Sequence, residues 1–260
     1  MIGKRGMINF VGAGPGAIDL ITVRGLELIK NADVIIYAGS LVNPALLGYA
    51  KEGTEIYDSS KMTLEEVLDV MIPAYESGKD VVRLHTGDAS IYGAIREQMD
   101  ELDKRGIPYA TCPGVSAAFG AASSLNLEYT LPGISQTLII TRMEGRTAVP
   151  DKEKIESLAS HRASMAIYLS AGMLDELSSR LISGGYPEDT PAAIVYKATW
   201  PEEKRIVCTL KTLAQEAKKE NITKTAIVLV GDVIAKSGYE RSKLYDPSFS
   251  TEFRQAKDTK

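Results

Sequence analysis

Short apolar runs alternate with longer amphipathic stretches through the first half of the chain. Runs of strand length lie at 7–11, 34–37, 81–84 and 109–112. Stretches with helical spacing of apolar positions lie at 21–31, 44–50, 91–104 and 115–125, with one more that starts at Thr63. This alternation predicts an α/β domain built on a mostly parallel sheet covered by helices.

The helix that starts at Thr63 has the clearest start signal in the chain. Thr63 and Glu66 have the spacing of a capping box, in which each residue's side chain accepts a hydrogen bond from the other's backbone. Val67, Leu68 and Met71 then fall on one helical face. We therefore expect a helix with its first turn at Leu64.

The pattern changes after Pro132 and Gly133. Strand candidates lie at 137–141, 164–169, 192–195, 205–210 and 225–230, and helical stretches at 152–160, 173–183 and 210–220. The strands around Val195 and Val207 are separated by too few residues for a helix, which predicts a hairpin. We expect an N-terminal α/β domain at 1–131, a mixed α+β domain at 132–235 and a polar tail at 236–260.

Composition places the chain among ordinary globular proteins. Its 260 residues are 44% hydrophobic and 25% charged, and the formal net charge of -4 argues against a protein that wraps nucleic acid. Cys112 and Cys208 are too far apart in sequence to suggest a disulfide framework or a metal knuckle, and are typical of reduced thiols. No apolar run approaches the roughly 18–20 residues of a membrane helix, so we expect a soluble cytoplasmic protein.

Three glycine-containing loops follow predicted strands. Residues 12–17 satisfy the dinucleotide fingerprint G-x-G-x-x-[G/A], but that motif needs an acid at the end of the second strand, and Asp33 precedes that strand. A tight turn that lets backbone approach a neighbour or ligand is the favoured alternative. Residues 85–93 and 113–118 follow the next central strands, where open α/β sheets bind ligands. These two loops suggest one shared ligand pocket. The alternatives are ordinary turns and, for Asp88, a helix cap.

The usual catalytic constellations are absent from the sequence. His85 and His161 are the only histidines, and neither has a second ligand at metal-binding spacing. Ser116 has no histidine partner in a nucleophile motif, which disfavours a hydrolytic triad. This combination fits a reaction whose reactivity is carried by a bound cofactor.

Two arginines lie in a glycine-broken loop that follows a predicted strand. Arg142 and Arg146, within residues 141–147, are suited to holding carboxylates through paired hydrogen bonds. The alternative is ordinary solvated surface charge, and the sequence alone leaves both possibilities open.

Taken together, these segments resemble the class III S-adenosylmethionine-dependent methyltransferases of tetrapyrrole biosynthesis. The shared motifs are VGAGPG at 11–16, DLITV at 19–23, ADVIIY at 32–37, GD at 87–88, IYG at 91–93 and PGVSA at 113–117. Motifs typical of the branch that acts on precorrin-4 or cobalt-precorrin-4 are YAGSL at 37–41, TR at 141–142, EGR at 144–146, VYKATWP at 195–201 and RSKLYD at 241–246. The resemblance extends from about residue 7 to 254.

The resemblance implies a two-domain fold, a homodimer, and S-adenosylmethionine bound between the domains and released as S-adenosylhomocysteine. It implies methyl transfer to C11 of precorrin-4 or cobalt-precorrin-4, giving the corresponding precorrin-5 in cobalamin synthesis. The loop at 12–17 would line the tetrapyrrole trough rather than cradle a dinucleotide. Uroporphyrinogen-methylating relatives have an Asp after the residue equivalent to Tyr37, but this chain has Ala38, so no base is carried over.

Site residues follow from the resemblance position by position. The expected cofactor contacts are Pro15, Thr86, Gly87, Asp88, Ile91, Ser116, Ala117, Leu169 and Ala198. The substrate bears acetate and propionate groups, for which we expect Arg142, Arg146, Arg96 and Lys61 as anchors; no metal site and no specific catalytic residue are expected.

Three other functions are compatible with part of this pattern. A nicotinamide-dependent oxidoreductase would need an acidic residue at the end of the second strand, where this chain has none. A class III methyltransferase acting on another precorrin position or on a macromolecule would share the N-terminal motifs but should lack the segments at 141–147 and 196–201. A non-catalytic tetrapyrrole-binding protein would have no reason to keep every cofactor loop.

Overall fold

The structure, a computed structural model, describes residues 6–257 and divides into two compact units. The first unit comprises Met1–Ala121 with Lys197–Glu203, and the second comprises Ala122–Tyr196 with Lys204–Lys260. The division therefore lies ten residues before the predicted one, inside helix α4 (Ala117–Leu125). Segment 197–203, which connects two strands of the second unit, groups with the first, and residues 236–257 group with the second rather than forming a separate part.

The first unit is built on a five-stranded, all-parallel sheet. Its order is β3-β2-β4-β1-β5, with β1 at Ile8–Gly12, β2 at Val34–Tyr37, β3 at Glu55–Asp58, β4 at Val81–His85 and β5 at Tyr109–Cys112. The four predicted strands are confirmed to within a residue. β3 was not predicted, because it is a partly exposed edge strand with a polar residue at each end.

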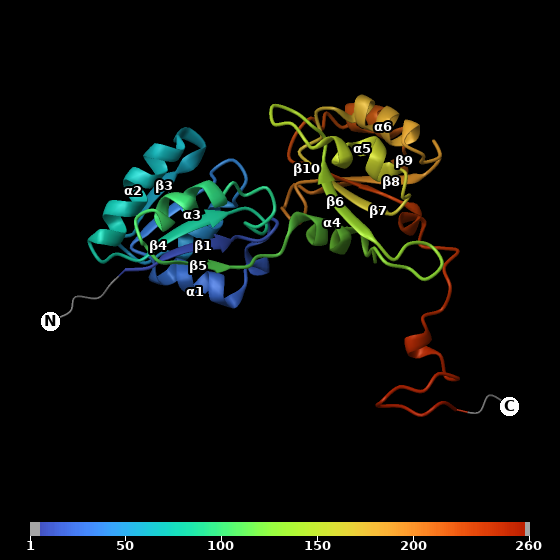
Figure 1. The fold of residues 1–260 in the computed structure, drawn as a ribbon, viewed down its shortest axis with the longest axis horizontal. Coiled ribbons are helices and arrows are strands. Elements are labelled where there is room, and N and C mark those ends of the chain that lie inside the picture. The colour runs from blue at the N-terminus through green and yellow to red at the C-terminus, as the bar shows by residue number, and fades with distance from the viewer. Residues whose placement is uncertain (1–5, 258–260) are drawn as a thin grey trace. The chain divides into compact units, whose positions relative to one another are not determined.

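Helices cover both faces of this sheet (Figure 1). α1 (Val23–Asn31) lies on one face, and α2 (Leu64–Glu76) and α3 (Arg96–Asp103) lie on the other. The capping box of α2 is confirmed, because Thr63 Oγ1 accepts from Glu66 N at 3.3 Å and Glu66 Oε2 accepts from Thr63 N at 2.7 Å. The stretch predicted at 44–50 is a 3₁₀ helix at Pro44–Tyr49.

One predicted helix is shorter than expected. α3 begins at Arg96, so the first five residues of the predicted helix at 91–104 form a loop. Tyr92 and Ala94 have left-handed φ angles of 55° and 49°, and such residues cannot continue a right-handed helix. The segment after β4 is therefore a long strand-end loop rather than a helix start.

The chain order creates a switch point at the middle of the first sheet. β1 and β4 are neighbours, yet β1 leads to α1 on one face and β4 leads to α3 on the opposite face. In open parallel sheets the loops that diverge in this way leave a crevice at the carboxyl ends of the strands, which is where ligands bind. The motif-bearing loops at 12–17 and 85–93 are the two loops that diverge there.

The second unit contains a mixed five-stranded sheet, as predicted. Its order is β6-β7-β10-β8-β9, with β6 at Leu138–Arg142, β7 at Ser164–Tyr168, β8 at Pro191–Tyr196, β9 at Lys204–Thr209 and β10 at Ala226–Val230. Only β6 and β7 pair in parallel, and the predicted hairpin is confirmed by the antiparallel pairing of β8 with β9.

Three helices pack on one face of the second sheet (Figure 1). They are α5 (Ile155–Ala159), α6 (Leu174–Ser183) and α7 (Leu213–Lys219), and their apolar side chains share one core with β7, β8 and β10. α5 and α7 are shorter than the predicted stretches at 152–160 and 210–220. Across residues 6–257, no helix combines the length and the apolar character needed to cross a membrane.

Candidate functional site

Backbone hydrogen bonds join the loops after β1 and β4 directly beyond the strand ends. Ala13 N donates to the carbonyl of His85 at 2.7 Å. Gly14 and Gly87 then exchange a reciprocal pair, with N···O distances of 3.2 and 2.8 Å. The two loops therefore extend the pairing of their strands by two residues and hold each other in place.

Asp88 connects this pair to the loop after β5. Its Oδ2 accepts from Gly114 N at 2.9 Å, and its Oδ1 accepts from the Ser90 N–H at 2.9 Å and from the Ser90 hydroxyl at 2.5 Å. The alternative that Asp88 is a helix cap is wrong, because α3 begins only at Arg96. Burial acts to raise the pKa of the Asp88 carboxyl, but the hydrogen bonds from Ser90 and Gly114 outweigh it, and the pKa lies below its usual value.

Replacing Asp88 by Asn tests this connection. The amide accepts through one oxygen only, so we expect Asp88→Asn to destabilise the protein by about 1 kcal/mol at neutral pH. A lowered folded-state pKa stabilises the protein above the unfolded value of about 4, and this contribution is lost as the pH falls from that value through the lower folded-state pKa. Thermal midpoints of wild type and variant should therefore converge below about pH 4.

The control for this substitution is Asp69→Asn, which changes an exposed carboxylate on α2. We expect its thermal midpoint to follow that of the wild type at every pH. A difference between Asp88→Asn and wild type that stays constant from neutral pH to pH 3 would contradict the assigned role of the carboxylate.

The three loops approach so closely that only glycine fits at two positions. A Cβ on Gly12 would lie 2.6 Å from both Gly114 N and Gly87 O, and a Cβ on Gly114 would lie 2.1 Å from Gly87 O. Real Cβ atoms do not approach backbone atoms this closely. The glycines in these motifs are thus required by the contact between the loops, which favours the tight-turn interpretation of residues 12–17.

Segment 197–203 packs on the loop after β1. Thr199 Oγ1 accepts from Ala17 N at 3.0 Å, and Trp200 Nε1 donates to the carbonyl of Pro15 at 3.1 Å. The Trp200 ring occupies the space beside Gly16, where a Cβ would lie 2.0 Å from Trp200 Cδ1. This anchoring role of Thr199 and Trp200 was missed by the sequence reasoning, since no local spacing links residues 185 positions apart.

The backbone of the same segment is unusual. Lys197 and Thr199 have left-handed φ angles of 46° and 68°, on either side of Ala198, which is buried. Such conformations are uncommon outside glycine and persist only where surrounding contacts impose them. Here the contacts to Pro15 and Ala17 impose them.

The predicted cofactor residues divide between the two units. Six lie in the three joined loops: Pro15, Thr86, Gly87, Asp88, Ser116 and Ala117. Ile91 follows closely, with its N–H donating to the Asp88 carbonyl at 3.2 Å, and Ala198 lies in the anchored segment. Leu169 belongs to the second unit, where it directly follows β7 with a φ of 53° and is 65% exposed.

Two of the four predicted substrate anchors, Arg142 and Arg96, have partners of their own. The Arg142 guanidinium donates to three carbonyls of its own loop, those of Met143, Thr147 and Ala148, at 3.0–3.1 Å. Arg146 is exposed in that loop. In the first unit, Arg96 pairs with Asp100 and Asp103 on α3, and Lys61 is exposed at the end of the 3₁₀ helix Ser59–Lys61.

An ion-pair cluster holds the arginine-bearing loop to the helices of the second unit. Arg180 on α6 pairs with Glu144 of the loop at 2.7 Å and with Glu156 of α5 at 2.5 Å. Hydrogen bonding and charge from Arg180 lower the pKa of both carboxyls. Arg142 and Glu144 thus both stabilise the conformation of the loop, whereas the cationic side chain of Arg146 is exposed.

His85 offers no proton exchange at neutral pH. Burial and the nearby charge of Arg83 lower its pKa to about 3, and its Nε2 is buried with no hydrogen-bond partner among the described residues. His161 is exposed in the second unit. Within the described chain, no group of three or more His, Cys, Asp or Glu side chains is arranged to hold a metal ion.

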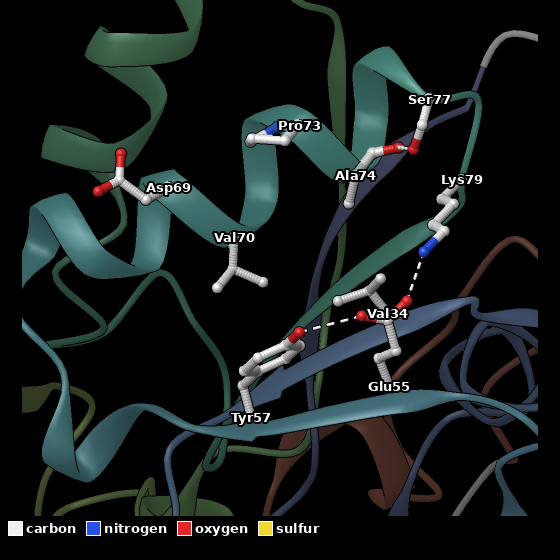
Figure 2. A pocket seen from close by; sticks show the side chains of 9 residues that line it. All are labelled: Val34, Glu55, Tyr57, Asp69, Val70, Pro73, Ala74, Ser77 and Lys79. Carbon is white, nitrogen blue, oxygen red and sulfur yellow. Dashed lines mark hydrogen bonds and ion pairs between the residues drawn. The ribbon is translucent and has the colours of Figure 1, made fainter.

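A pocket lies at the edge of the first sheet opposite the joined loops (Figure 2). This pocket of about 290 Å³ is lined by Val34 and Glu55, the first residues of β2 and β3, and by Lys79, just before β4. Two of its three charged residues are paired with each other, since Lys79 forms an ion pair with Glu55, and Tyr57 donates to the other Glu55 oxygen at 3.0 Å. It contains none of the predicted site residues.

Comparison with known proteins identifies the family. The family model of the Tetrapyrrole (Corrin/Porphyrin) Methylases matches residues 7–214. The chain is 56% identical over 249 residues to the cobalt-precorrin-4 C(11)-methyltransferase of Methanocaldococcus jannaschii, covering 96% of each chain. It is 42% identical over 239 residues to the precorrin-4 C(11)-methyltransferase of Mycobacterium tuberculosis (strain H37Rv), covering 92% of this chain and 95% of the relative.

A solved structure shares both the fold and the sequence. The X-ray structure of a cobalamin biosynthetic enzyme, cobalt precorrin-4 methyltransferase, superposes with a TM-score of 0.86 at 43% identity, covering 88% of this chain and 95% of that one. The parallel first sheet, the mixed second sheet and the motif-bearing loops agree with this match. The chain therefore belongs to the tetrapyrrole (corrin/porphyrin) methylases, a family of S-adenosylmethionine-dependent enzymes.

Proposed function

We propose that this enzyme transfers the methyl group of S-adenosylmethionine to C11 of precorrin-4 or its cobalt complex in cobalamin biosynthesis. The observation that carries this proposal is the close similarity, over 96% of the chain, to an enzyme named for that reaction. The joined loops at the switch point of the first sheet support it, because they place the family motifs at the edge where parallel sheets bind ligands. We place the reaction in the cytoplasm.

The residues present fit a bound nucleoside-type cofactor. Gly87, Ser116 and Ala117 have small side chains or none, so little side-chain bulk stands between the joined loops and a ligand. Thr86 adds a half-buried hydroxyl at the end of β4 that has no partner within residues 6–257. In this proposal Thr86, Gly87, Asp88, Ser116 and Ala117 hold the cofactor, with Asp88 acting by fixing the loop of Gly114.

The cofactor supplies an activated methyl group on a sulfonium centre. C11 would form its new bond to the methyl carbon with an electron pair of the ring, while the carbon–sulfur bond breaks with its pair staying on sulfur and S-adenosylhomocysteine leaves. The positive charge would pass from sulfur to the ring, which would release it as a proton to solvent. The protein's contribution is to hold the two reactants aligned, so no covalent enzyme intermediate is required. The rigid joined loops suit this positioning role.

Of the two arginines in the loop after β6, the exposed Arg146 is the better candidate to bind a substrate carboxylate. We expect Arg146→Ala to raise the KM for the tetrapyrrole about five-fold, because the loss of an exposed ion pair costs about 1 kcal/mol of binding free energy. The thermal midpoint should not change. Arg142→Ala removes three hydrogen bonds within the loop and should also lower the thermal midpoint. Steady-state kinetics and thermal denaturation measure both effects.

The matched control is Lys224→Ala, which removes an exposed cation from the same unit. Its KM for the tetrapyrrole should equal that of the wild type. If Arg142→Ala and Arg146→Ala both leave substrate KM and turnover unchanged, neither arginine anchors the substrate.

The decisive test of the proposed reaction uses methyl-labelled S-adenosylmethionine. The enzyme is incubated separately with precorrin-4 and with cobalt-precorrin-4, and the labelled carbon of each product is located by NMR. Label at C11 is the expected result, and the faster substrate identifies whether cobalt is present in the natural one. Label at another ring position, or transfer only to a macromolecule added instead, would overturn the proposed reaction while leaving the family assignment intact.

We also propose that the enzyme acts as a homodimer, as the family resemblance implies. Light scattering coupled to size-exclusion chromatography would give about twice the 28.1 kDa chain mass if this is correct. A monomer mass at micromolar concentration would overturn it.

A further inference from the structure

A buried arginine lies in the core of the first unit with no role in the site described above. Arg83 is the middle residue of β4 and is only 6% exposed. Its side chain lies on the sheet face covered by α2 and α3, whereas its neighbours Val82 and Leu84 pack in the core on the α1 side. A charged side chain at such a position is rare in proteins unless it is paired.

The hydrogen bonds of Arg83 are made only to neutral acceptors. Its Nε donates to Gln98 Oε1 at 3.1 Å, and its Nη1 donates to the carbonyl of Ile36 at 3.2 Å. Among residues 6–257 no carboxylate forms an ion pair with it, and Nη2 has no partner. Burial lowers the pKa of Arg83 to about 10, so the group is still a cation at neutral pH.

The other groups near Arg83 do not compensate its charge. His85, two residues further along β4, is neutral at physiological pH because its pKa is about 3. The Ser59 hydroxyl donates to the carbonyl of Tyr37. Thr63 Oγ1 accepts from the Glu66 N–H in the capping box of α2. Glu97 is exposed and forms no ion pair with Arg83. A buried cation without a counterion is costly, and an anion that approaches it gains correspondingly.

A small pocket gives outside access to Arg83. It has a volume of about 170 Å³ and lies between the N-terminal ends of α2 and α3. Arg83 and the exposed Glu97 are the charged residues of its lining, which also includes Thr63, Gly93, Ala94 and Gln98. One liquid water takes about 30 Å³, so a carboxylate on a short carbon chain fits, while a tetrapyrrole ring does not. Gly93 and Ala94 belong to the loop that starts at Gly87 and Asp88, so the pocket adjoins the proposed cofactor loops.

We infer that the Arg83 pocket is a carboxylate-binding site, and that it receives one acetate or propionate side chain of the tetrapyrrole while the ring stays outside. This identification of the ligand rests on the proposed function, whereas the carboxylate chemistry rests on the pocket alone. The free Nη2 edge of the guanidinium presents planar donors, which suit a carboxylate. The Gln98 amide, whose Nε2 donates to the Ala94 carbonyl at 3.1 Å, adds its second N–H. The site fixes the ring's orientation relative to the cofactor loops by holding one of its arms.

The first test examines the pocket without the reaction. The full-length protein, labelled with ¹⁵N-arginine, is titrated with sodium propionate at constant ionic strength, and the Arg83 Nε–H signal is assigned from its absence in Arg83→Lys. We expect a saturable shift of this signal, with no shift for propionamide, which has the same shape and no charge. An Arg83 signal that does not respond to propionate would overturn the carboxylate site.

The second test identifies the ligand by kinetics. Arg83→Met keeps the buried stem but removes the charge. The loss of two hydrogen bonds, to Gln98 Oε1 and the Ile36 carbonyl, opposes the gain from removing a buried cation that has no counterion, so we expect the variant to fold with a thermal midpoint close to that of the wild type. The KM for the tetrapyrrole should rise at least ten-fold, while the KM for S-adenosylmethionine is unchanged. Arg105→Met, which removes an exposed arginine paired with Glu101 just after α3, is the matched control and should leave both KM values unchanged.

The outcomes separate this inference from the proposed function. A rise in the KM for S-adenosylmethionine alone would mean that the pocket holds the carboxylate of the cofactor, which overturns the assigned ligand. A lowered thermal midpoint with both KM values unchanged would mean a purely structural arginine and would overturn the site. If the enzyme methylates neither form of precorrin-4, the proposed function fails and with it the assigned ligand, while the propionate titration still decides whether the pocket binds carboxylates.

Discussion

Gly114→Ala should abolish most of the activity although it adds a single methyl group. The new Cβ would lie 2.1 Å from the carbonyl oxygen of Gly87 and 2.8 Å from backbone atoms of Gly12, none of which is the end of a flexible side chain. The loop after β5 must therefore move away from the other two, and the hydrogen bond from Gly114 to Asp88 is lost with it. We expect destabilisation of about 1–3 kcal/mol from the overpacking.

The effect on function should exceed the effect on stability. The displaced loop includes Ser116 and leads into α4 at Ala117, both proposed cofactor contacts, and a displacement of about 1 Å of positioning groups can reduce turnover about 100-fold. Calorimetric titration with S-adenosylmethionine should show at least ten-fold weaker binding, and turnover at saturating substrates should fall further.

Gly48→Ala is the matched control for this substitution. Gly48 lies in the 3₁₀ helix Pro44–Tyr49, and a Cβ there would meet nothing within 4 Å. Cofactor affinity and thermal midpoint should match those of the wild type. Wild-type cofactor affinity in Gly114→Ala would show that the joined loops do not form the cofactor site.

Trp200→Ala should release segment 197–203 from the loop after β1. The substitution removes the indole packed beside Gly16 and the hydrogen bond to the Pro15 carbonyl. Complete truncation of a fully buried aromatic residue costs about 3–5 kcal/mol, and Trp200 is half-buried, so we expect about 2 kcal/mol. The left-handed conformations of Lys197 and Thr199 should then relax, moving Ala198 and weakening cofactor binding about ten-fold.

Trp200 also provides its own reporter, because it is the only tryptophan in the chain. Its fluorescence should change when S-adenosylmethionine is added to the wild type, if Ala198 and Pro15 contact the cofactor. Trp200→Phe keeps a ring beside Gly16 but lacks the N–H donor, and its loss of affinity should lie between those of wild type and Trp200→Ala. Phe253→Ala, which truncates an aromatic residue that is 91% exposed, is the control and should change neither stability nor affinity. Equal cofactor affinity in Trp200→Ala and wild type would remove segment 197–203 from the site.

The strands of both sheets could be predicted because their signal is local. Runs such as Val34–Tyr37 and Ser164–Tyr168 are apolar on both faces, and burial on both faces is what central strands require. β3 escaped prediction since an edge strand is partly exposed and keeps polar residues such as Glu55 and Asp58. The start of α3 was predicted too early, because the left-handed φ angles of Tyr92 and Ala94 are imposed by loop packing and have no signature in hydrophobic spacing.

The site could be predicted only in part, for a related reason. The motif loops were found because strand order along the chain and the rule that ligands bind at carboxyl ends of strands bring them to one edge. The partners of individual charges were not found: Arg142 is bound by three carbonyls of its own loop, and Arg96 by two carboxylates of its own helix. A long charged side chain pairs with the groups that lie within hydrogen-bonding distance in the folded chain. The sequence alone was compatible with several such partners for each arginine.

The sequence by itself determined the fold class, the family and the position of the glycine-rich loops, because periodic burial and motif spacing are properties of short segments. Only the tertiary structure decided that Asp88 joins two loops rather than capping a helix, that Trp200 lies beside Gly16, and that Arg83 is a buried cation facing a small pocket. Each of these depends on contacts between residues that are 15 to 185 positions apart along the chain. Such contacts exist only once the sheet has brought its strand ends together.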